Sequence, residues 1–299
     1  MTLPMPWGRR ATFELLSMYM AVKTRPAIGV MARCAGSCKR GGVLSTVRVV
    51  NTEGKTLVPT VKVVLLDMGG VVLDMAGGHG FPNDRLDWRG REALLNLIRS
   101  HGGRADSELL DSVLFEPWHH EYKRRNETLQ EADWRPHLAN LSSEIGVKIA
   151  HGAMLEVWFR PYGEQLQPID GVSGALDELS RLKIPVVLVS NVPMPGSFYS
   201  TVLSRLALQR HFRHLFFSYD QGSRKPSPAM LRHACEAVGV SPFDAVMVGD
   251  RRDRDIAAGQ LAGSTTVWIK SSDSGGPDPD HAIDSLAELP DLLRHKLSA

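Results

Sequence analysis

The stretch VKVVLLDMGGVV, residues 61–72, decides the fold, because an apolar and largely β-branched run stops abruptly at a carboxylate. Residues 61–66 suit a strand that is buried on both faces, as the strands of a parallel sheet are. Asp67 ends this run, and a pair of glycines follows closely. One strand that ends on a polar residue is ordinary in a globular protein. The stretch gains meaning only if other strands end in a similar way.

Further apolar runs follow along the chain, with helical stretches between them. These runs are PVVLV (185–189), LFF (215–217), AVMV (245–248) and TTVWI (265–269). In the helical stretch SPAMLRHACEAVGV (227–240), we expect Ser227 to cap the helix, with Pro228 at the first helical position and Gly239 after the end. Strands that alternate with helices predict an α/β fold, in which a parallel sheet is covered by helices on both faces.

Residues 80–165 interrupt this alternation, because they show helical periods and no convincing strand. Apolar residues recur at three- and four-residue spacing in REALLNLIRS (91–100), SELLDSVLF (107–115) and AMLEVWF (153–159). Thr128 and Glu131 form a candidate capping box at the start of a further helix. We therefore expect a helical insert between the first and second strands.

The aromatic and basic residues of this insert have simple structural interpretations. Its tryptophans are expected in the core of a helical bundle: Trp88, Trp118, Trp134 and Trp158. The run KRR (123–125) is interpreted as a solvated face. The pair HH (119–120) is interpreted as surface or packing residues, because adjacent residues on a helix do not face the same way.

The composition is that of a globular protein and excludes several classes of function. The chain has 299 residues, 43% hydrophobic and 23% charged, which are ordinary values. A net charge of +2 is too small to favour nucleic acid or a membrane surface as partner. No window of about 18 apolar residues predicts a membrane span. The three cysteines argue against a disulfide framework and fit a reducing compartment such as the cytoplasm.

The first 59 residues differ from the rest of the chain. Up to residue 50, eight basic residues accompany the single acid Glu14, with no sustained periodicity. A segment of this kind is either an organelle transit peptide or a disordered extension. We favour the extension and expect it to carry no chemistry.

The predicted strands bring polar side chains to one edge of the sheet. The first strand ends at Asp67, the second at Ser190-Asn191 and the fourth at Asp250. In an open parallel sheet, the carboxyl ends of the strands lie along the edge where ligands bind. Three separate strands therefore deliver a carboxylate, a hydroxyl–amide pair and a second carboxylate to one place.

Two further residues complete a coherent set. Lys225 precedes a predicted helix, and Asp255 lies five residues after Asp250. Converging carboxylates repel one another unless a cation lies between them, and their oxygens suit Mg²⁺. An aspartate is already an ionised nucleophile at neutral pH, and Mg²⁺ with a lysine would offset its repulsion from a phosphate. Ser190 and Asn191 would donate hydrogen bonds to the phosphate oxygens. The set suits phosphoryl transfer.

The motifs, taken in order, resemble those of the haloacid dehalogenase-type hydrolases, in their capped subfamily I phosphatase-like branch. The resemblance covers about residues 61–295. The matching segments are LLDMGGVVLD (65–74), VVLVSN (186–191), SRKPSPAML (223–231) and VMVGDRRDRDIAAGQLAG (246–263). The ordered occurrence of all four is a stronger signal than any one of them. The resemblance implies a Rossmann-like core of residues 60–76 and 168–299, a helical cap at residues 77–167, and an extension at residues 1–59.

The resemblance also implies a mechanism. Asp67 would form an aspartyl-phosphate intermediate that water then hydrolyses, and Lys225 would hold both the phosphate and this nucleophile. Ser190 and Asn191 would bind the phosphate of a small phosphorylated metabolite. The implied Mg²⁺ ligands are Asp67, the carbonyl of Gly69, Asp250 and Asp255. No family role is carried over to Arg251, Arg252 and Arg254.

Gly69 departs from the pattern of the family. Phosphatases of this type usually carry a second aspartate there, which serves as acid and then as base. General acid–base catalysis is typically worth about 10²- to 10⁴-fold. We therefore expect slow hydrolysis, or hydrolysis of good leaving groups only, unless Asp74, His79 or a cap residue supplies the proton. The alternatives are a catalytically silent binding or regulatory protein and, less favoured, a 2-haloacid dehalogenase.

Overall fold

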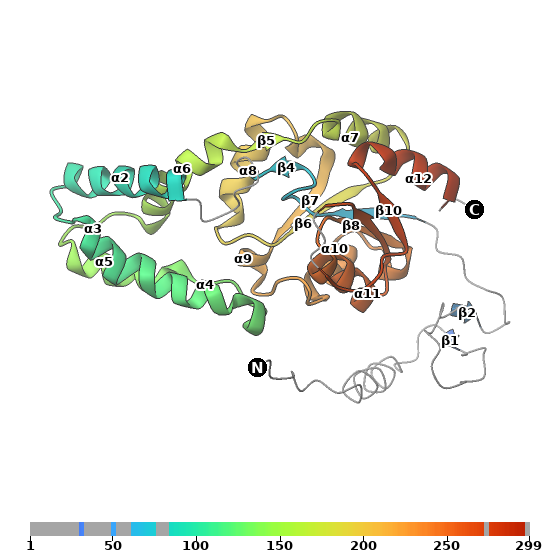
Figure 1. Ribbon diagram of the computed structural model, residues 1–299, viewed down its shortest axis with the longest axis horizontal. Coiled ribbons are helices and arrows are strands. Elements are labelled where there is room, and N and C mark those ends of the chain that lie inside the picture. Colours follow the sequence, from blue (N-terminus) through green and yellow to red (C-terminus); the bar gives the residue numbers. More distant parts are fainter. Residues whose placement is uncertain (1–29, 33–48, 52–60, 76–83, 272–274, 297–299) are drawn as a thin grey trace, which may run out of the picture. The chain divides into compact units, whose positions relative to one another are not determined.

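A computed structural model describes residues 30–32, 49–51, 61–75, 84–271 and 275–296 (Figure 1). The chain divides into two units, Met1–Val58 and Pro59–Ala299. In the first unit, β1 (Val30–Ala32) pairs with β2 (Val49–Asn51) as an antiparallel ladder. The rest of the predicted basic extension lies outside the described residues, as does His79.

The second unit is built on a six-stranded sheet in the order β10-β9-β8-β3-β6-β7, and every adjacent pair is parallel. Its strands are β3 (Val63–Leu66), β6 (Val186–Ser190), β7 (Phe212–Phe217), β8 (Ala245–Gly249), β9 (Thr265–Ile269) and β10 (His281–Ile283). The predicted α/β fold is confirmed, and each predicted apolar run overlaps a strand, although β3 begins two residues later than predicted and β6 one residue later. β10 was not predicted, because three residues carry too little pattern.

Alternating side chains of the sheet build two hydrophobic layers. Val63 and Leu65 pack on one face with α10 (Ala229–Ala237) and α11 (Ala257–Ala262). Val64 and Leu66 pack on the other face. The helices on that side are α7 (Val172–Arg181), α8 (Gly196–Arg205) and α12 (Leu289–Lys296). In Figure 1, α7 and α12 lie on the opposite side of the sheet from α10 and α11. Both faces are thus covered, which explains why the central strands are continuously apolar.

A helical insert follows β3, as predicted. Its helices are α2 (Asp84–Ser100), α3 (Ser107–Leu110), α4 (Glu116–Thr128), α5 (Trp134–Glu144) and α6 (His151–Gln165). Two short antiparallel strands, β4 (Leu73–Asp74) and β5 (Gln167–Pro168), flank the insert where the chain leaves and re-enters the core (Figure 1). None of the helices in the described ranges is both long and apolar enough to cross a membrane.

The core of the insert is aromatic, with one exception to the prediction. Trp118 stacks on Trp134 with ring centroids 4.0 Å apart, and Trp158 packs edge-on against Trp134 at 4.9 Å. All three are buried. Trp88 was expected among them but is 63% exposed. It lies on a face of α2 that points away from the bundle, so the prediction was wrong for this residue.

Two predicted helix starts differ from the structure. Thr128 is the last residue of α4 rather than the cap of a following helix, and α5 begins after Asp133, whose side chain accepts the N–H of Arg135. The capping box was wrong because Glu131 makes buried tertiary contacts instead. At the other position, α10 begins at Ala229, one residue later than expected. Ser227 still accepts the N–H of Ala229 there, at 3.4 Å.

Candidate active site

Three neighbouring strands bring polar residues to one edge of the sheet. β3 lies between β8 and β6, and Leu66 is in register with Val248 of β8. Asp67 directly follows β3, and its backbone N–H donates to the carbonyl of Val248 at 3.0 Å. Asp250 directly follows β8, and Ser190 is the last residue of β6. The matched register explains why residues far apart in sequence end at the same level.

Lys225 lies at the centre of this edge, with its side chain 1% exposed. Its ammonium group is 2.8 Å from Asp67 Oδ1 and 2.6 Å from Asp255 Oδ1, and it donates to the carbonyl of Val189 at 2.8 Å. All three ammonium protons therefore have acceptors. Burial opposes the charge, but the two adjacent carboxylates more than compensate, so the pKa of Lys225 is raised. Lys225 is a fixed positive charge beside Asp67.

Asn191 holds the backbone of Lys225 on both sides. The Asn191 amide oxygen accepts the N–H of Lys225, and its amide nitrogen donates to the carbonyl of Lys225, each at 2.9 Å. This pair of bonds ties the loop after β6 to the loop that precedes α10. The side-chain amide nitrogen of Asn191 has a second N–H, so the predicted contact with a phosphate is compatible with both bonds.

Three carboxylates meet around the lysine. Asp67, Asp250 and Asp255 offer oxygens that all lie within 4.8 Å of one another. Asp255 is buried, and its second oxygen accepts the N–H of Arg251 at 2.9 Å. Burial, together with the negative charges of Asp67 and Asp255, raises the pKa of Asp250 to about 7. Burial also raises the pKa of Asp255, which the nearby lysine partly offsets.

The donor set of this cluster fits a divalent cation. Three carboxylates face one lysine, which leaves two negative charges uncompensated when all are ionised. Asp250 Oδ1 is buried and has no hydrogen-bond partner in the described ranges. Gly70 lies so close that a Cβ there would be 2.6 Å from Asp250 Oδ2, and its φ of +73° also favours glycine. Such clusters of hard oxygen ligands suit Mg²⁺.

The cluster opens into a cavity of about 820 Å³, within the usual range for small-molecule sites of about 300–1,000 Å³. The cavity is lined by every predicted site residue: Asp67, Gly69, Ser190, Asn191, Lys225, Asp250 and Asp255. It is much larger than a phosphate group and a metal ion together require, so a larger molecule could enter.

Three arginines also line the cavity, and the sequence interpretation did not assign them. Arg251 follows Asp250 directly and Arg254 lies a few residues further on. Their position after β8 placed them near the site, but no family role pointed to them. Arg125 comes from α4 and is half-buried rather than part of a solvated face. No sequence signal indicated Arg125, because helical periodicity does not reveal how the insert is oriented over the sheet.

Position 69 lines the cavity but, being glycine, offers no acidic side chain. A Cβ added there would lie 3.2 Å from Cγ and 3.3 Å from Sδ of Met75, a flexible side chain. Two other carboxylates line the cavity. Asp74 belongs to β4, and Asp170 follows β5. These two carboxylates, rather than residue 69, are the acids that the described cavity offers beyond the central cluster.

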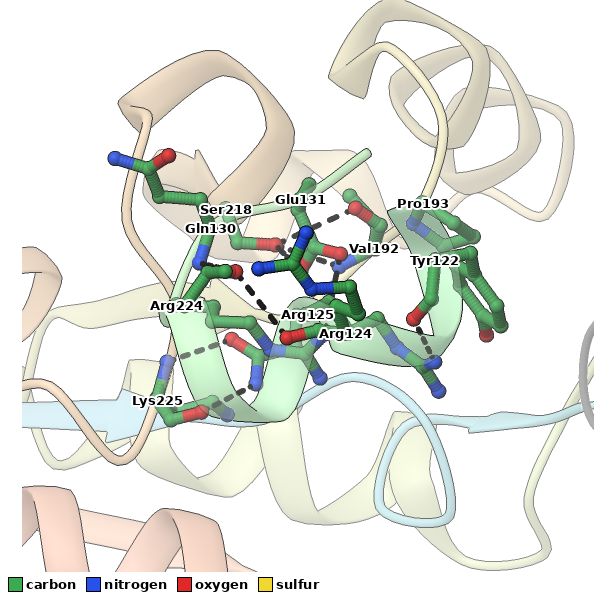
Figure 2. A network of polar contacts seen from close by, with 12 residues as sticks. Tyr122, Arg124, Arg125, Gln130, Glu131, Val192, Pro193, Ser218, Arg224 and Lys225 are labelled. Carbon is green, nitrogen blue, oxygen red and sulfur yellow. Dashed lines mark hydrogen bonds and ion pairs between the residues drawn. The ribbon is translucent and has the colours of Figure 1, made fainter. Parts of the chain in front are cut away.

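A buried polar network joins the helical insert to this edge of the core (Figure 2). Glu131 accepts a hydrogen bond from Ser218 at 2.6 Å and is paired with Arg224 at 3.3 Å. Ser218 begins α9 (Ser218–Gln221), and its hydroxyl also accepts the N–H of Val192 at 2.9 Å. The backbone of Arg224 adds a bond to the carbonyl of Leu129, at 3.1 Å. The insert is therefore bonded directly to Ser218 and to Arg224, the residue before Lys225, and through Ser218 to the loop after β6.

Comparison with known proteins agrees with this geometry. The family model for haloacid dehalogenase-like hydrolases matches residues 61–263, which contain all seven predicted site residues. The chain belongs to the haloacid dehalogenase-like hydrolase family. The predicted family and enzyme class are thus confirmed. This hydrolase is 25% identical over 244 residues to N-acylneuraminate-9-phosphatase of Mus musculus. The aligned region covers 78% of this chain and 94% of the relative.

A shorter sequence match and a solved structure are also similar to this chain. A glyceraldehyde 3-phosphate phosphatase of Pyrococcus furiosus is 37% identical over 127 residues, 41% of this hydrolase and 52% of the relative. Among solved structures, a haloacid dehalogenase-family phosphatase of Thermococcus onnurineus has a TM-score of 0.54 and 22% identity. That match covers 79% of this hydrolase and 99% of the solved chain. This structural likeness supports the fold.

Proposed function

We propose that this hydrolase cleaves small phosphomonoesters with the help of Mg²⁺, through an aspartyl-phosphate on Asp67. The observation that carries the proposal is the ammonium group of Lys225, which bridges Asp67 and Asp255 beside the orphaned oxygen of Asp250. Several relatives across the family are named phosphatases. In this proposal, residues 60–76 and 168–299 form the catalytic core and residues 77–167 the cap that selects the substrate.

The nucleophile is one carboxylate oxygen of Asp67. Lys225 holds Oδ1, and Oδ2 accepts no hydrogen bond from the described residues, so Oδ2 is available for attack. A bond forms between this oxygen and phosphorus while the ester oxygen leaves and takes up a proton. Water then adds to the acyl phosphate, releasing inorganic phosphate and restoring the carboxylate. Lys225 offsets the repulsion between the anionic nucleophile and the anionic phosphate.

Asp67, Asp250, Asp255 and the carbonyl of Gly69 are the groups that would hold Mg²⁺. The ion would supply charge stabilisation for the phosphoryl group during transfer. Burial, and then the negative charges of Asp67 and Asp255, raise the pKa of Asp250, and a bound cation would offset the repulsion between these carboxylates. Ser190, 2% exposed at the end of β6, is the hydroxyl that we assign to the phosphate.

Proton delivery to the leaving group is the weak step, because Gly69 has no acid to offer. We assign this proton to water or to Asp74, which lines the cavity. Hydrolysis of esters with acidic leaving groups, such as aryl phosphates, would then be favoured over hydrolysis of alkyl esters, since an acidic leaving group needs less help from a proton.

The test is hydrolysis of 4-nitrophenyl phosphate with and without Mg²⁺, by wild type and by the Asp67→Asn variant. We expect activity that EDTA abolishes and that the Asp67→Asn variant lacks. Asp284→Asn, at an exposed residue that does not line the cavity, should behave as wild type and serves as the control. Chloride release from 2-chloropropionate would instead identify a dehalogenase. No hydrolysis by wild type would defeat the proposal and favour a silent binding protein. Equal hydrolysis by the Asp67→Asn variant would also defeat it, because Asp67 could not then be the nucleophile.

A further inference from the structure

Positive charge lines the cavity beyond the carboxylate cluster, and part of it lacks an acidic partner. Arg251 holds both oxygens of Asp253, at 3.0 and 3.1 Å. Arg254 lies 3.7 Å from the same carboxylate, with its side chain 28% exposed. One carboxylate is thus shared by two guanidinium groups of the lining, and Arg251 occupies both of its oxygens.

Arg125 on α4 has no acidic partner in the described part of the chain. Its guanidinium lies 3.4 Å from the centroid of the Tyr122 ring and donates one N–H to the carbonyl of Tyr122 (Figure 2). No described carboxylate lies within 4.0 Å of it. Stacking and this bond fix the plane of the guanidinium, while most of its five N–H groups remain free to donate.

The charges of Arg125 and Arg254 act on the same part of the molecule. Burial lowers the pKa of Arg224 to about 10, and the positive charges of Arg125 and Arg254 contribute to this shift. Glu131 is close enough to interact electrostatically with both arginines, but Ser218 and Arg224 already occupy its oxygens. The cavity wall made by α4 and the segment after β8 therefore presents Arg125, which has no acidic partner among the described residues, and Arg254, which shares its carboxylate with Arg251.

We infer that the substrate carries a second anionic group, a carboxylate or another phosphate, which Arg125 and Arg254 bind. The inference rests on the proposed phosphatase function and names the substrate class of that site. Lys225 and the carboxylate cluster lie at the strand ends, where the transferred phosphate would bind. Arg125 comes from the insert, so it meets the part of the substrate that the phosphate does not occupy. Its fixed, planar fork matches a carboxylate or phosphate in two parallel hydrogen bonds.

The inference predicts a preference between closely matched substrates. The probes are 4-(carboxymethyl)phenyl phosphate, its neutral methyl ester and 4-(phosphonomethyl)phenyl phosphate, each with its meta isomer. The methylene group keeps the leaving-group chemistry similar throughout. We expect kcat/KM to be about 10- to 100-fold higher for an anionic probe than for the ester, because charge-assisted hydrogen bonds to the second anion would strengthen binding by about that factor. Comparison of the carboxylate and phosphonate probes identifies which anion fits.

The Arg125→Gln variant tests the residue itself. It should remove most of the preference for the anionic probe, chiefly through KM, and leave kcat/KM for the ester within about twofold. Arg125→Lys should keep part of the preference, because it retains charge without the fork. Arg124→Gln, an exposed neighbour on α4, is the matched control.

The outcomes separate this inference from the proposed function. If the ester is hydrolysed as well as every anionic probe, the inference is overturned while the phosphatase function stands. Equal losses for the ester and the anionic probe in Arg125→Gln also overturn it, because the arginine would then act on the transferred phosphate. If no probe is hydrolysed at all, the proposed function fails and the inference fails with it.

Discussion

Glu131 and Arg224 form a buried ion pair that links the helical insert to the residue immediately before Lys225. Their side chains are 4% and 3% exposed. Through Ser218, Glu131 also reaches Val192, the residue after Asn191, and Asn191 holds the backbone of Lys225. Glu131 is thus connected to Lys225 in two ways: through Arg224, its neighbour in the chain, and through the loop that contains Asn191. Contact between the insert and the core is therefore expected to affect the chemistry and not only the stability.

Replacing Glu131 with alanine tests this link. The change leaves the Arg224 guanidinium buried without its carboxylate, and removing one partner of a buried pair costs about 3–5 kcal/mol. We expect the free energy of unfolding, from denaturant titration, to fall by that order. In the protein that remains folded, kcat should fall more than KM rises, because Lys225 loses its supports.

The exposed pair of Lys270 and Asp284, at 2.8 Å, is the control for this experiment. Lys270→Ala should change the free energy of unfolding by less than about 1 kcal/mol and leave kcat unchanged, because exposed ion pairs contribute little. A Glu131→Ala protein as stable and as active as Lys270→Ala would show that the buried network has no such role.

Lys225→Met removes the charge between the carboxylates while keeping a similar side-chain length. Asp67 and Asp255 would then face each other without a positively charged side chain between them, and the nucleophile would lose a fixed hydrogen-bond donor. Loss of one preorganised donor typically lowers kcat by about 10²- to 10³-fold. We expect at least this loss, measured with 4-nitrophenyl phosphate at saturating Mg²⁺. Lys62→Met, at a 56% exposed lysine paired with Asp244, should behave as wild type.

The central site was predictable from sequence because parallel strands impose its geometry. Once 61–66 and 245–248 were assigned as strands, Asp67 and Asp250 had to lie at one edge, and the register of β3 with β8 brings them together. Lys225 was included because its loop precedes a predicted helix, and the resemblance then gave it a role. The role of Asn191 as a support for Lys225 depends on loop conformation, which strand patterns do not encode.

The contribution of the insert was not predictable in the same way. Glu131 had the spacing of a capping box with Thr128, and this local signal concealed a contact with residues almost a hundred positions away. Arg125 lay in a basic run typical of solvated helices. Periodicity predicts which residues of a helix share a face, but the direction in which that face points depends on packing between the insert and the core.

Metal binding should depend on pH through Asp250, whose pKa is raised to about 7 from its ordinary 3.8. Because the folded protein holds this proton more tightly than the unfolded chain, the metal-free protein loses stability as pH rises from about 4 to 7. A cation binds the ionised form, so its stabilising effect should grow over the same window. We expect the rise in Tm on adding Mg²⁺ to be small at pH 5 and near its maximum at pH 8.

The Asp250→Asn variant supplies the comparison for this experiment. It removes the titrating group, so the metal-free protein should be more stable than wild type at pH 8, where the wild-type carboxylate is ionised and buried. Its Tm should respond weakly to Mg²⁺ at either pH. A wild-type Tm shift of the same size at pH 5 and pH 8 would contradict the assignment of Asp250 as a ligand.

Gly69→Asp should increase activity by supplying the missing acid. Gly69 has an ordinary negative φ, and the new Cβ would meet only the flexible side chain of Met75, at 3.2 Å, so the substitution is sterically tolerable. We expect kcat for alkyl phosphates with poor leaving groups to rise by up to about 10²- to 10⁴-fold, and kcat for 4-nitrophenyl phosphate to change far less.

Gly69→Asn, equal in size but unable to donate the proton as an acid, should show no gain. Gly70→Asp should inactivate, because its Cβ would lie 2.6 Å from Asp250. Equal rates for the aspartate and asparagine variants at position 69 would mean that proton transfer does not limit this enzyme.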